Sequence, residues 1–325
     1  MRKKRINWFF TIARFSAVMC AVVLLAACSR QDETVRFIVM GDSRGSFGGG
    51  AVNEEILTEM ANAVLHEDVD FVLFTGDLVW GGASEGTLQE QIATWIEIMQ
   101  PVYDAGIGVY PIRGNHEMLQ DTAAGDAWKS VFVGQYAVPD NGSGDEKGLT
   151  YSFSYKNVFV AGLDEYANEH RVNQQWLDAQ LTANDQPHVF VFGHEPAFKA
   201  LHPDCLDDYP AQRDAFWENI MEAGGRIYFT GHDHFYDHTR LDDGDGRSGN
   251  DLHQIIAGGS GADLYDEPVY DGDNSRWIPM PVYHEKEFGY VLVEVTGKRV
   301  RSIWKHRTGP DTYEPGGDDF TYWAR

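Results

Sequence analysis

Short apolar segments alternate with amphipathic segments along most of this chain, and that alternation restricts the fold more than any other feature of the sequence. The apolar segments have the length and composition of buried strands and lie at residues 35–43, 70–77, 108–115, 188–194 and 226–232. The segments between them have helical spacing and lie at residues 53–67, 87–106, 172–184 and 212–225. Continuous apolar strands separated by helices predict an α/β fold with a largely parallel sheet that is covered on both faces.

Two regions depart from this alternation. Residues 151–164 read as a hairpin with its turn near Lys156 and Asn157, and the part from residue 253 onward is rich in strands. Residues 118–148 are rich in glycine and acidic residues, so we predict an inserted loop region there. Since the sequence contains neither an internal repeat nor a linker, we expect one catalytic domain over residues 35–325.

The N-terminus has the pattern of an export signal. Basic residues at 2–5 precede an apolar run at 15–27, which is shorter than the roughly 20 residues that a membrane-spanning helix needs. The order Leu25-Ala26-Ala27-Cys28 resembles the bacterial lipobox, although an ordinary signal peptide with a chance cysteine is the alternative. The resemblance implies a signal peptide at residues 1–27, lipid on Cys28 and a tether at residues 28–34. Ser29 after the cysteine favours an outer membrane, on its periplasmic side.

The chain is strongly acidic. It contains 50 acidic and 26 basic residues, for a net charge of −24, and loss of residues 1–27 would leave 21 basic residues and a net charge of −29. Such a surface repels polyphosphate backbones, so binding of long nucleic acid through a basic groove is disfavoured. The charge identifies no protein partner, and we expect contact with a membrane only through the N-terminal lipid.

Each of five predicted strands is followed by a turn that pairs glycine with a side chain able to bind a metal. These turns are Gly41-Asp42, Gly76-Asp77, Gly114-Asn115-His116, Gly193-His194 and Gly231-His232-Asp233-His234. One such pair has little meaning, but five in order, each at a strand end, are hard to obtain by chance. In α/β sheets ligands bind beyond the carboxyl ends of the strands, so we expect these side chains to meet there.

With these turns the chain resembles the calcineurin-like metallophosphoesterase superfamily, which includes purple acid phosphatases and cyclic-nucleotide phosphodiesterases. The similarity runs from Asp42 to about Gly261, and the motifs GNHE at 114–117 and GHDH at 231–234 carry most of it. The resemblance implies a four-layer α/β/β/α sandwich that holds two metal ions. Oxygen and imidazole ligands together suit iron, manganese or zinc better than calcium or magnesium.

Matched residue by residue, the resemblance implies a ligand set. Asp77 would bridge both metal ions, Asp42 and His234 would hold the first, and Asn115, His194 and His232 would complete the second. His116 corresponds to a histidine near the leaving group, and Glu117 beside it is expected to orient or tune its imidazole. Two cations would make a water acidic enough to attack phosphorus.

The first metal position departs from the family pattern. The first motif usually reads GDxH, whereas this chain reads GDSR with Arg44 in place of the histidine, and Trp80 stands where purple acid phosphatases have a tyrosine ligand. A guanidinium has no lone pair for a metal, so we expect the first ion to be weaker or exchangeable. Arg44 either grips two phosphate oxygens or is a loop arginine paired with an acid, and the sequence leaves both open.

Several other residues allow two interpretations. Asp164 and Glu165 end the hairpin and could support the metal ligands. His238 could reach the site, although a surface or loop histidine is favoured, and His202 lacks partners with ligand spacing and is assigned no role. The acidic run 242–251 favours a solvated loop over a calcium loop, because the acid of the twelfth position is missing. Aromatic residues that either form the rim of the site or pack in the core are Trp80, Tyr265, Tyr270 and Trp277.

The expected function is that of a metal-dependent phosphoric ester hydrolase, a phosphomonoesterase or phosphodiesterase, which acts on a small phosphoester through a dinuclear centre and a metal-activated hydroxide. The candidate catalytic residues are His116, Glu117 and Arg44. The alternative is a lipid-anchored protein that binds phosphate-bearing ligands with little turnover, because its first metal site is degenerate. A binding protein has no use for a leaving-group acid, so His116 favours the enzyme.

Overall fold

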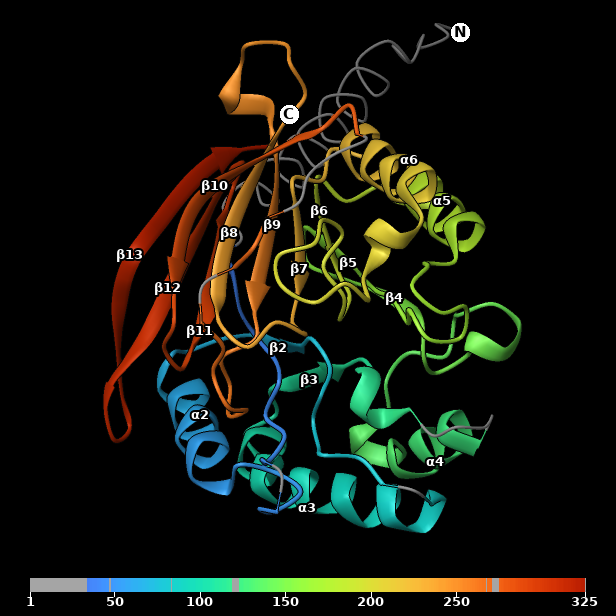
Figure 1. Cartoon of the computed structure of the whole chain (residues 1–325), viewed down its shortest axis with the longest axis vertical. Helices are drawn as coiled ribbons and strands as arrows, with labels where there is room; N and C mark the ends of the chain where they lie inside the picture. Colours follow the sequence, from blue (N-terminus) through green and yellow to red (C-terminus); the bar gives the residue numbers. More distant parts are fainter. Residues whose placement is uncertain are drawn as a thin grey trace, which may run out of the picture.

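The computed structural model describes residues 34–46, 48–82, 84–118, 123–266, 268–270 and 275–324. These residues form two β-sheets with helices packed against each (Figure 1). The expected signal peptide, the lipidation site Cys28 and all of the tether except Thr34 lie outside the described residues. No helix within the described ranges is long and apolar enough to cross a membrane.

The first sheet is built from both ends of the described chain. Its strand order is β13-β12-β11-β1-β2-β3, with β1 (Thr34–Met40), β2 (Phe71–Phe74), β3 (Gly108–Pro111), β11 (Gly289–Thr296), β12 (Arg299–Gly309) and β13 (Thr312–Trp323). β1, β2 and β3 are parallel, and β11, β12 and β13 join antiparallel beside β1. The C-terminal strands therefore extend the sheet that the N-terminal βαβαβ unit begins.

The second sheet has the strand order β10-β8-β9-β7-β6-β5-β4. Its strands are β4 (Tyr151–Tyr155), β5 (Val158–Gly162), β6 (His188–Phe192), β7 (Ile227–Thr230), β8 (Tyr236–Asp242), β9 (Leu252–Ala257) and β10 (Ile278–Glu285). β5, β6, β7 and β9 are parallel, whereas β4 pairs antiparallel with β5 and β8 pairs antiparallel with β9 and β10. The β4–β5 hairpin turns at Lys156 and Asn157, as predicted.

Helices cover one face of each sheet. α2 (Glu54–His66), α3 (Glu85–Asp104) and α4 (Ala123–Val131) pack on the first sheet, and α5 (Gln174–Ala183) and α6 (Pro210–Glu222) pack on the second (Figure 1). The other faces of the two sheets pack on each other, where Phe37 of β1 meets Phe190 of β6 edge to face with ring centroids 5.0 Å apart. These layers confirm the expected α/β/β/α sandwich.

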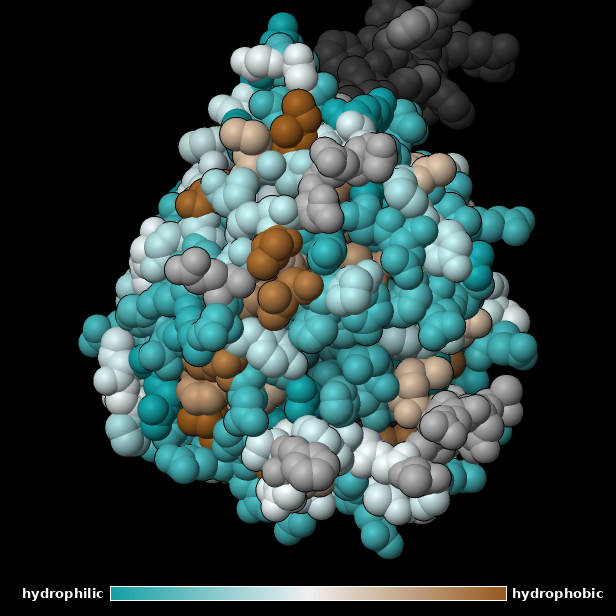
Figure 2. Space-filling view, in the orientation of Figure 1, coloured by the Kyte–Doolittle hydropathy of each residue, from teal (hydrophilic) through white to brown (hydrophobic). Residues whose placement is uncertain are grey.

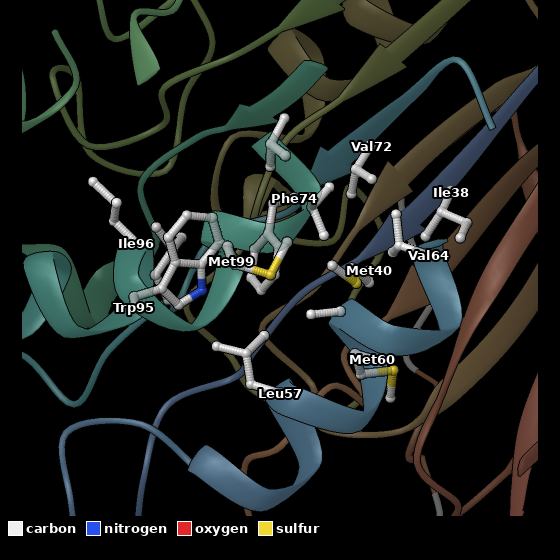
Figure 3. Close-up of a cluster of buried hydrophobic side chains, with 14 of the residues drawn as sticks. Ile38, Met40, Leu57, Met60, Val64, Val72, Phe74, Trp95, Ile96 and Met99 are labelled. Atoms are coloured by element: carbon white, nitrogen blue, oxygen red, sulfur yellow. The ribbon is translucent and has the colours of Figure 1, made fainter. Parts of the chain in front are cut away.

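The core beneath α2 and α3 shows how the amphipathic segments position the site. Met60 and Val64 of α2, and Trp95 and Met99 of α3, are fully buried and repeat at i, i+4 on one face of each helix (Figure 3). Trp95 packs edge to face on Phe74 of β2, with ring centroids 5.1 Å apart. Burial of each such side chain contributes roughly 1.5–3 kcal/mol relative to exposure. This layer holds the ends of β1 and β2, from which the first two polar turns project.

Two expectations drawn from periodicity alone are wrong. The single, largely parallel sheet is instead two mixed sheets, because an apolar strand has the same pattern whether helices or another sheet cover its faces. Residues 118–148 are not simply a loop region, since they contain α4 and short 3₁₀ helices at Gly134–Tyr136 and Gly144–Glu146. Trp128 of α4 is buried and packs on Phe132 with ring centroids 4.3 Å apart, which anchors this segment despite its glycines.

Candidate metal centre

The polar turns come together at the edge where the parallel strands of both sheets end. The turns after β1, β2, β3, β6 and β7 carry Asp42, Asp77, Asn115, His194 and His232. Backbone hydrogen bonds join neighbouring turns, from the Asp42 N–H to the Gly76 carbonyl (3.0 Å) and from the Gly231 N–H to the His194 carbonyl (2.9 Å). One backbone framework therefore assembles the side chains that the sequence places at the strand ends.

The backbone of these turns is sharply bent. φ is 62° at Asp42, 49° at Asp77 and 70° at His232, in the left-handed region that residues other than glycine rarely adopt. Such conformations cost of the order of 1–3 kcal/mol each and persist where the surrounding structure enforces them. A Cβ atom at Gly114 would lie 2.1 Å from Asp77 Oδ1, so the turn after β3 requires glycine to approach the turn after β2.

The residues expected at the second metal position are Asp77, Asn115, His194 and His232, and the structure brings them together. Asn115 Oδ1 lies 3.1 Å from His194 Nε2 and 3.2 Å from His232 Nδ1. Asp77 Oδ1 lies 3.4 Å from the same His194 Nε2. Two oxygens and two ring nitrogens thus converge on one small space from four separate turns.

His194 presents a lone pair to this space, whereas Asp204 and Asp233 outweigh burial and raise the pKa of His232, which presents one when only its Nε2 is protonated. His194 Nδ1 lies 2.7 Å from the Thr75 carbonyl oxygen and donates its proton there, which leaves Nε2 as an acceptor. Burial lowers the pKa of His194 to about 4, so the ring is neutral at neutral pH. His232 Nε2 is buried without a hydrogen-bond partner among the described residues and lies 3.6 Å from Asp204 Oδ1. A proton on Nε2 toward Asp204 leaves His232 Nδ1, the atom that faces Asn115, free to bind a metal.

The donors of the second position fit a transition metal. Carboxylate, amide and imidazole groups in this combination suit iron, manganese or zinc. The acceptor atoms Asn115 Oδ1 and His194 Nε2 face each other across 3.1 Å, which is favourable when a cation lies between them.

The residues expected at the first metal position are Asp42, Asp77 and His234. His234 Nδ1 lies 2.9 Å from the Asp263 carbonyl oxygen, and its Nε2 lies 3.7 Å from Asp42 Oδ1. Burial and the adjacent Arg44 guanidinium lower the pKa of His234 to about 3. The ring also stacks on Tyr265, so His234 is a neutral and fixed imidazole beside Asp42.

Arg44 lies inside the site. Its Nε is 3.4 Å from Asp77 Oδ2, its Nη2 is 3.4 Å from His234 Nε2, and only 10% of the side chain is exposed. The guanidinium carbon lies 5.1 Å from the centre of the Trp80 ring. The acid that Arg44 contacts is therefore Asp77 of the site itself, not one of the many surface acids.

Two buried carboxylates lie close together in the centre. Asp42, Asp77 and His194 each offer a ligand atom within 4.8 Å of the others. Burial and the nearby Asp77 raise the pKa of Asp42 well above its usual value. Burial also opposes the charge of Asp77, but His194 and His116 hold its pKa below the usual value. Buried like charges are costly unless cations offset them, so this centre requires positive charge.

The comparisons with known proteins agree with this geometry. The model of the calcineurin-like phosphoesterase family matches residues 35–236, which is more than half of the chain. The chain belongs to that family. It is 26% identical to purple acid phosphatase 18 of Arabidopsis thaliana over 257 residues, which cover 76% of this chain and 55% of that protein. The chain thus spans about half the length of this curated relative.

Solved structures of phosphatases share the fold of this calcineurin-like phosphoesterase. A purple acid phosphatase from yellow lupin (Lupinus luteus) seeds gives a TM-score of 0.67 at 17% identity, over 90% of this chain and 54% of that chain. A dimetal phosphatase from Danio rerio gives a TM-score of 0.57 at 16% identity, over 90% of this chain and 99% of that chain. Proteins of the purple acid phosphatase type use dinuclear centres of iron, zinc or manganese, and Asp42, Asp77 and His194 form a candidate metal site of that kind.

In this calcineurin-like phosphoesterase, Glu117 does not have the position that the sequence predicts. It ends the one-turn helix η1 (Asn115–Glu117), is buried, and its carboxylate accepts hydrogen bonds from the N–H groups of Gly114 (2.7 Å), Asp77 (3.1 Å) and Val79 (3.0 Å). A glutamate at the third position of a turn reaches back to the start of that turn. Its oxygens are therefore hydrogen-bonded to the backbone and do not orient the His116 ring. Glu117 therefore braces the turns after β2 and β3.

Glu165 lies behind His194, as the sequence suggests. Its carboxylate accepts hydrogen bonds from the N–H groups of His194 (2.8 Å) and Glu195 (2.6 Å) and from the Tyr228 hydroxyl (2.5 Å). Burial raises the pKa of Glu165 to about 7. Its neighbour Asp164 instead forms a bidentate pair with Arg113, at 2.7 and 2.9 Å.

His202 belongs to the site although the sequence gives it no role. Its Nδ1 lies 2.5 Å from Asp233 Oδ1, and its ring centre lies 4.9 Å from that of His232 and 5.1 Å from that of Tyr265. One third of the side chain is exposed, so the ring borders the mouth of the site. The sequence signal that could have indicated His202 is Asp233, the one acid of the GHDH motif for which the sequence predicts no role.

The remaining candidates lie in the core or away from the centre. His238 is buried on β8 between Asp318 (2.8 Å) and His253 (2.8 Å), so the expected loop position is wrong. Trp277 is buried in the core of the second sheet, and Tyr270 binds Asp237, whereas Trp80 and Tyr265 border the site.

The acidic run at 242–251 places three carboxylates close together. Asp242, Asp243 and Asp251 offer oxygens within 4.8 Å of one another, and Arg240 pairs with Asp251 at 2.9 Å. Exposed acidic groups commonly gather in this way without an ion, so the run carries no site assignment.

Proposed function

We propose that the chain is a metal-dependent phosphoester hydrolase that acts on small phosphomonoesters or phosphodiesters. The observation that carries the proposal is the convergence of Asp77, Asn115, His194 and His232 on one position from four turns. Buried acceptors that face one another destabilise a fold unless a cation joins them, so a purely structural role does not account for this cluster. Membership of the calcineurin-like phosphoesterase family supports the same chemistry.

Asp77 is proposed to serve both metal positions. Its Oδ1 faces His194 at 3.4 Å and its Oδ2 faces Arg44 at 3.4 Å, so the two oxygens point to different halves of the site. The proposed ligands are Asp42, Asp77 and His234 for the first ion and Asp77, Asn115, His194 and His232 for the second. Metal ions held there would acidify a water molecule and neutralise charge on the phosphoryl oxygens.

His116 is proposed to donate a proton to the leaving group. Its Nδ1 lies 2.6 Å from the Trp80 carbonyl oxygen and donates to it, which fixes the ring with Nε2 directed toward the site. Nε2 lies 3.9 Å from Asp77 Oδ2, and 22% of the side chain is exposed. In the imidazolium form, Nε2 would give its proton to the alcohol that leaves at the mouth of the site.

The space beside the second position can accommodate a small substrate. An open cavity of about 320 Å³ is lined by Trp80, Gly81, Gly82, Asn115, His116 and Met118. This volume suits a phosphoryl group with a small alcohol. The face of the molecule in Figure 2 is largely hydrophilic, and the chain has a net charge of −24, which disfavours long polyanions. We therefore propose a small phosphoester as the substrate.

We also propose that the protein is exported and is held at a bacterial membrane, on the periplasmic side of an outer membrane, through lipid on Cys28. The support is the basic and apolar pattern of residues 1–27 followed by the lipobox-like tetrapeptide. Bacteria that express the wild type or Cys28→Ala and grow with labelled palmitate test this proposal. Only the wild type should take up label, and equal labelling of both proteins would contradict it.

An assay with metal removal and return tests the enzymatic function. The purified full-length protein is stripped of metal and mixed with manganese, zinc or iron, and hydrolysis of p-nitrophenyl phosphate and of bis(p-nitrophenyl) phosphate is then measured. We expect turnover of at least one ester, lost on chelation and restored by metal. A folded, metal-loaded protein that binds inorganic phosphate but hydrolyses neither ester would support the phosphate-binding alternative instead.

A further inference from the structure

Arg44 enters the site from the turn after β1 and is held there by several contacts. Its backbone N–H donates to the Asp77 carbonyl oxygen (3.1 Å), and the residue forms an isolated antiparallel bridge with Val52. Its Nη1 donates to the Gly45 carbonyl oxygen (3.2 Å) and its Nη2 to the Tyr265 hydroxyl (3.4 Å). The guanidinium is therefore held in a fixed position within the site and is not a mobile surface group.

The guanidinium lies among the groups proposed to bind the first metal ion. Its Nη2 is 3.4 Å from His234 Nε2, the ring atom that also faces Asp42, and its Nε is 3.4 Å from Asp77 Oδ2. Nε is buried and has no hydrogen-bond partner within the described part of the chain. A guanidinium has no lone pair to offer a metal, and its charge repels a cation nearby. In this arrangement the guanidinium of Arg44 supplies the positive charge that a metal ion would otherwise bring to the first position.

We propose that Arg44 is a built-in competitor for the first metal ion, so that the two positions load at very different metal concentrations. The inference rests on the proposed function, because it takes the site to be a metal centre. The second position fills first. The first position accepts an ion only when the guanidinium leaves His234 and Asp77, so the protein holds one ion when metal is scarce and two when it is abundant.

Metal stoichiometry tests this proposal without any assay of turnover. Metal-free full-length protein is dialysed against a series of Mn²⁺ concentrations, and the bound metal is counted by mass spectrometry. The wild type should bind one ion tightly and a second at least about tenfold more weakly, as expected for repulsion by a nearby charge. Arg44→Met removes the charge and should tighten the second ion by at least about tenfold, whereas Arg44→Lys should behave like the wild type.

Two further variants complete the experiment. Arg44→His adds a ligand and should tighten the second ion further than Arg44→Met does. The control Arg276→Met removes the same charge from an exposed pair with Glu218 (3.2 Å) and should change neither affinity. Folded protein, checked by circular dichroism, is required of every variant.

The proposal has clear contrary outcomes. Two ions bound with equal affinity by the wild type would overturn it, and so would an unchanged second affinity in folded Arg44→Met and Arg44→His. Equal affinities in the wild type overturn the proposal even when a variant fails to fold, whereas support for it requires the tighter second ion of folded Arg44→Met. Because no substrate is present, a protein that binds metal as expected but hydrolyses nothing would contradict the proposed function and leave this inference standing.

Discussion

The two proposed metal positions share Asp77 but are built differently. At the second position, Asn115 Oδ1 contacts one ring nitrogen of each of two histidines, at 3.1 and 3.2 Å. At the first position, Asp42 and His234 are 3.7 Å apart, and the guanidinium of Arg44 lies against the same histidine. The second position brings oxygen and nitrogen ligand atoms together without an arginine or lysine among them. The first position already contains the positive side chain of Arg44.

This difference shows how a site can keep most of its ligands and still change how it loads. A histidine in place of Arg44 would add a lone pair to the first position, whereas arginine adds a fixed positive charge. Two buried carboxylates need positive charge, and either a metal ion or a guanidinium offsets them. If the proposal is right, the second position depends on a metal ion, whereas the first is stable with or without one.

Asp77→Asn should have the largest effect, because both positions use this carboxylate. We expect kcat/KM for the better ester to fall about a thousandfold or more, since stabilisation of the transition state by the metals is worth several kcal/mol. The tightly bound ion should also be lost on dialysis. Asp185→Asn, at an exposed residue, is the matched control. A loss below about tenfold in folded protein would mean that Asp77 does not join the two positions.

His194→Ala and His234→Ala should separate the positions. Each ring is fixed from behind by one backbone carbonyl, that of Thr75 (2.7 Å) or that of Asp263 (2.9 Å), so the two variants remove comparable groups. We expect His194→Ala to weaken the tight ion by about a hundredfold or more and His234→Ala to remove only the weaker ion. Metal counting after dialysis measures both. Equal losses in the two variants would remove the proposed difference between the positions.

Much of this site could be predicted because it depends on local pattern. The glycine-led turns mark strand ends, and the carboxyl ends of parallel strands meet at one edge of a sheet, so Asp42 and Asp77 had to lie near each other. His194 follows a strand of the second sheet, and only the resemblance brought it to the same site. Apart from α4, the helices and longer strands between residues 35 and 232 likewise follow the apolar periodicity. The four layers came from the resemblance, since periodicity reports burial but not what covers a strand.

The remainder depends on where individual side chains point. Arg44 has a long side chain that could reach a phosphate, a surface acid or the metal ligands, and the letters GDSR do not distinguish these. His202 lies in a loop without regular spacing, so no rule connects it with Asp233. Glu117 turns back to the backbone because its own turn offers three N–H groups within reach. Tertiary contacts determine the orientation of these side chains, and the periodicity of the sequence does not predict it.

Glu165→Gln should have an intermediate effect, confined to the second position. The carboxylate accepts hydrogen bonds from two N–H groups and the Tyr228 hydroxyl behind His194, and an amide would direct its NH₂ toward one of these donors. We expect the affinity for the tight ion to fall about 10–100-fold and the weaker ion to be unaffected, as measured by metal titration. Glu218→Gln, at a half-exposed residue, is the control. An unchanged tight affinity would show that His194 needs no such support.

Asp42→Asn should give the smallest effect, and in the metal-free protein it should be stabilising. Burial and the nearby Asp77 raise the pKa of Asp42 well above its usual value, so its charge destabilises the folded state. Asparagine keeps an oxygen that can accept the His232 N–H (3.0 Å) while it removes the charge. We expect the metal-free variant to melt a few degrees above the wild type at pH 7, at roughly 2–4 °C per kcal/mol, as measured by scanning calorimetry.

The pH dependence gives this last prediction its sign. A carboxyl whose pKa is higher in the folded than in the unfolded state binds protons preferentially when folded, so the stability of the wild type rises as pH falls through the folded pKa of Asp42. The advantage of Asp42→Asn should therefore shrink toward acid pH and reverse when metal is bound, because the carboxylate then offsets the charge of the ion. A variant that gains nothing at any pH would mean that Arg44 already neutralises Asp42 completely. The first position would then be a complete ion pair that needs no metal. The two positions would differ in whether they bind a metal ion, not in how tightly they bind it.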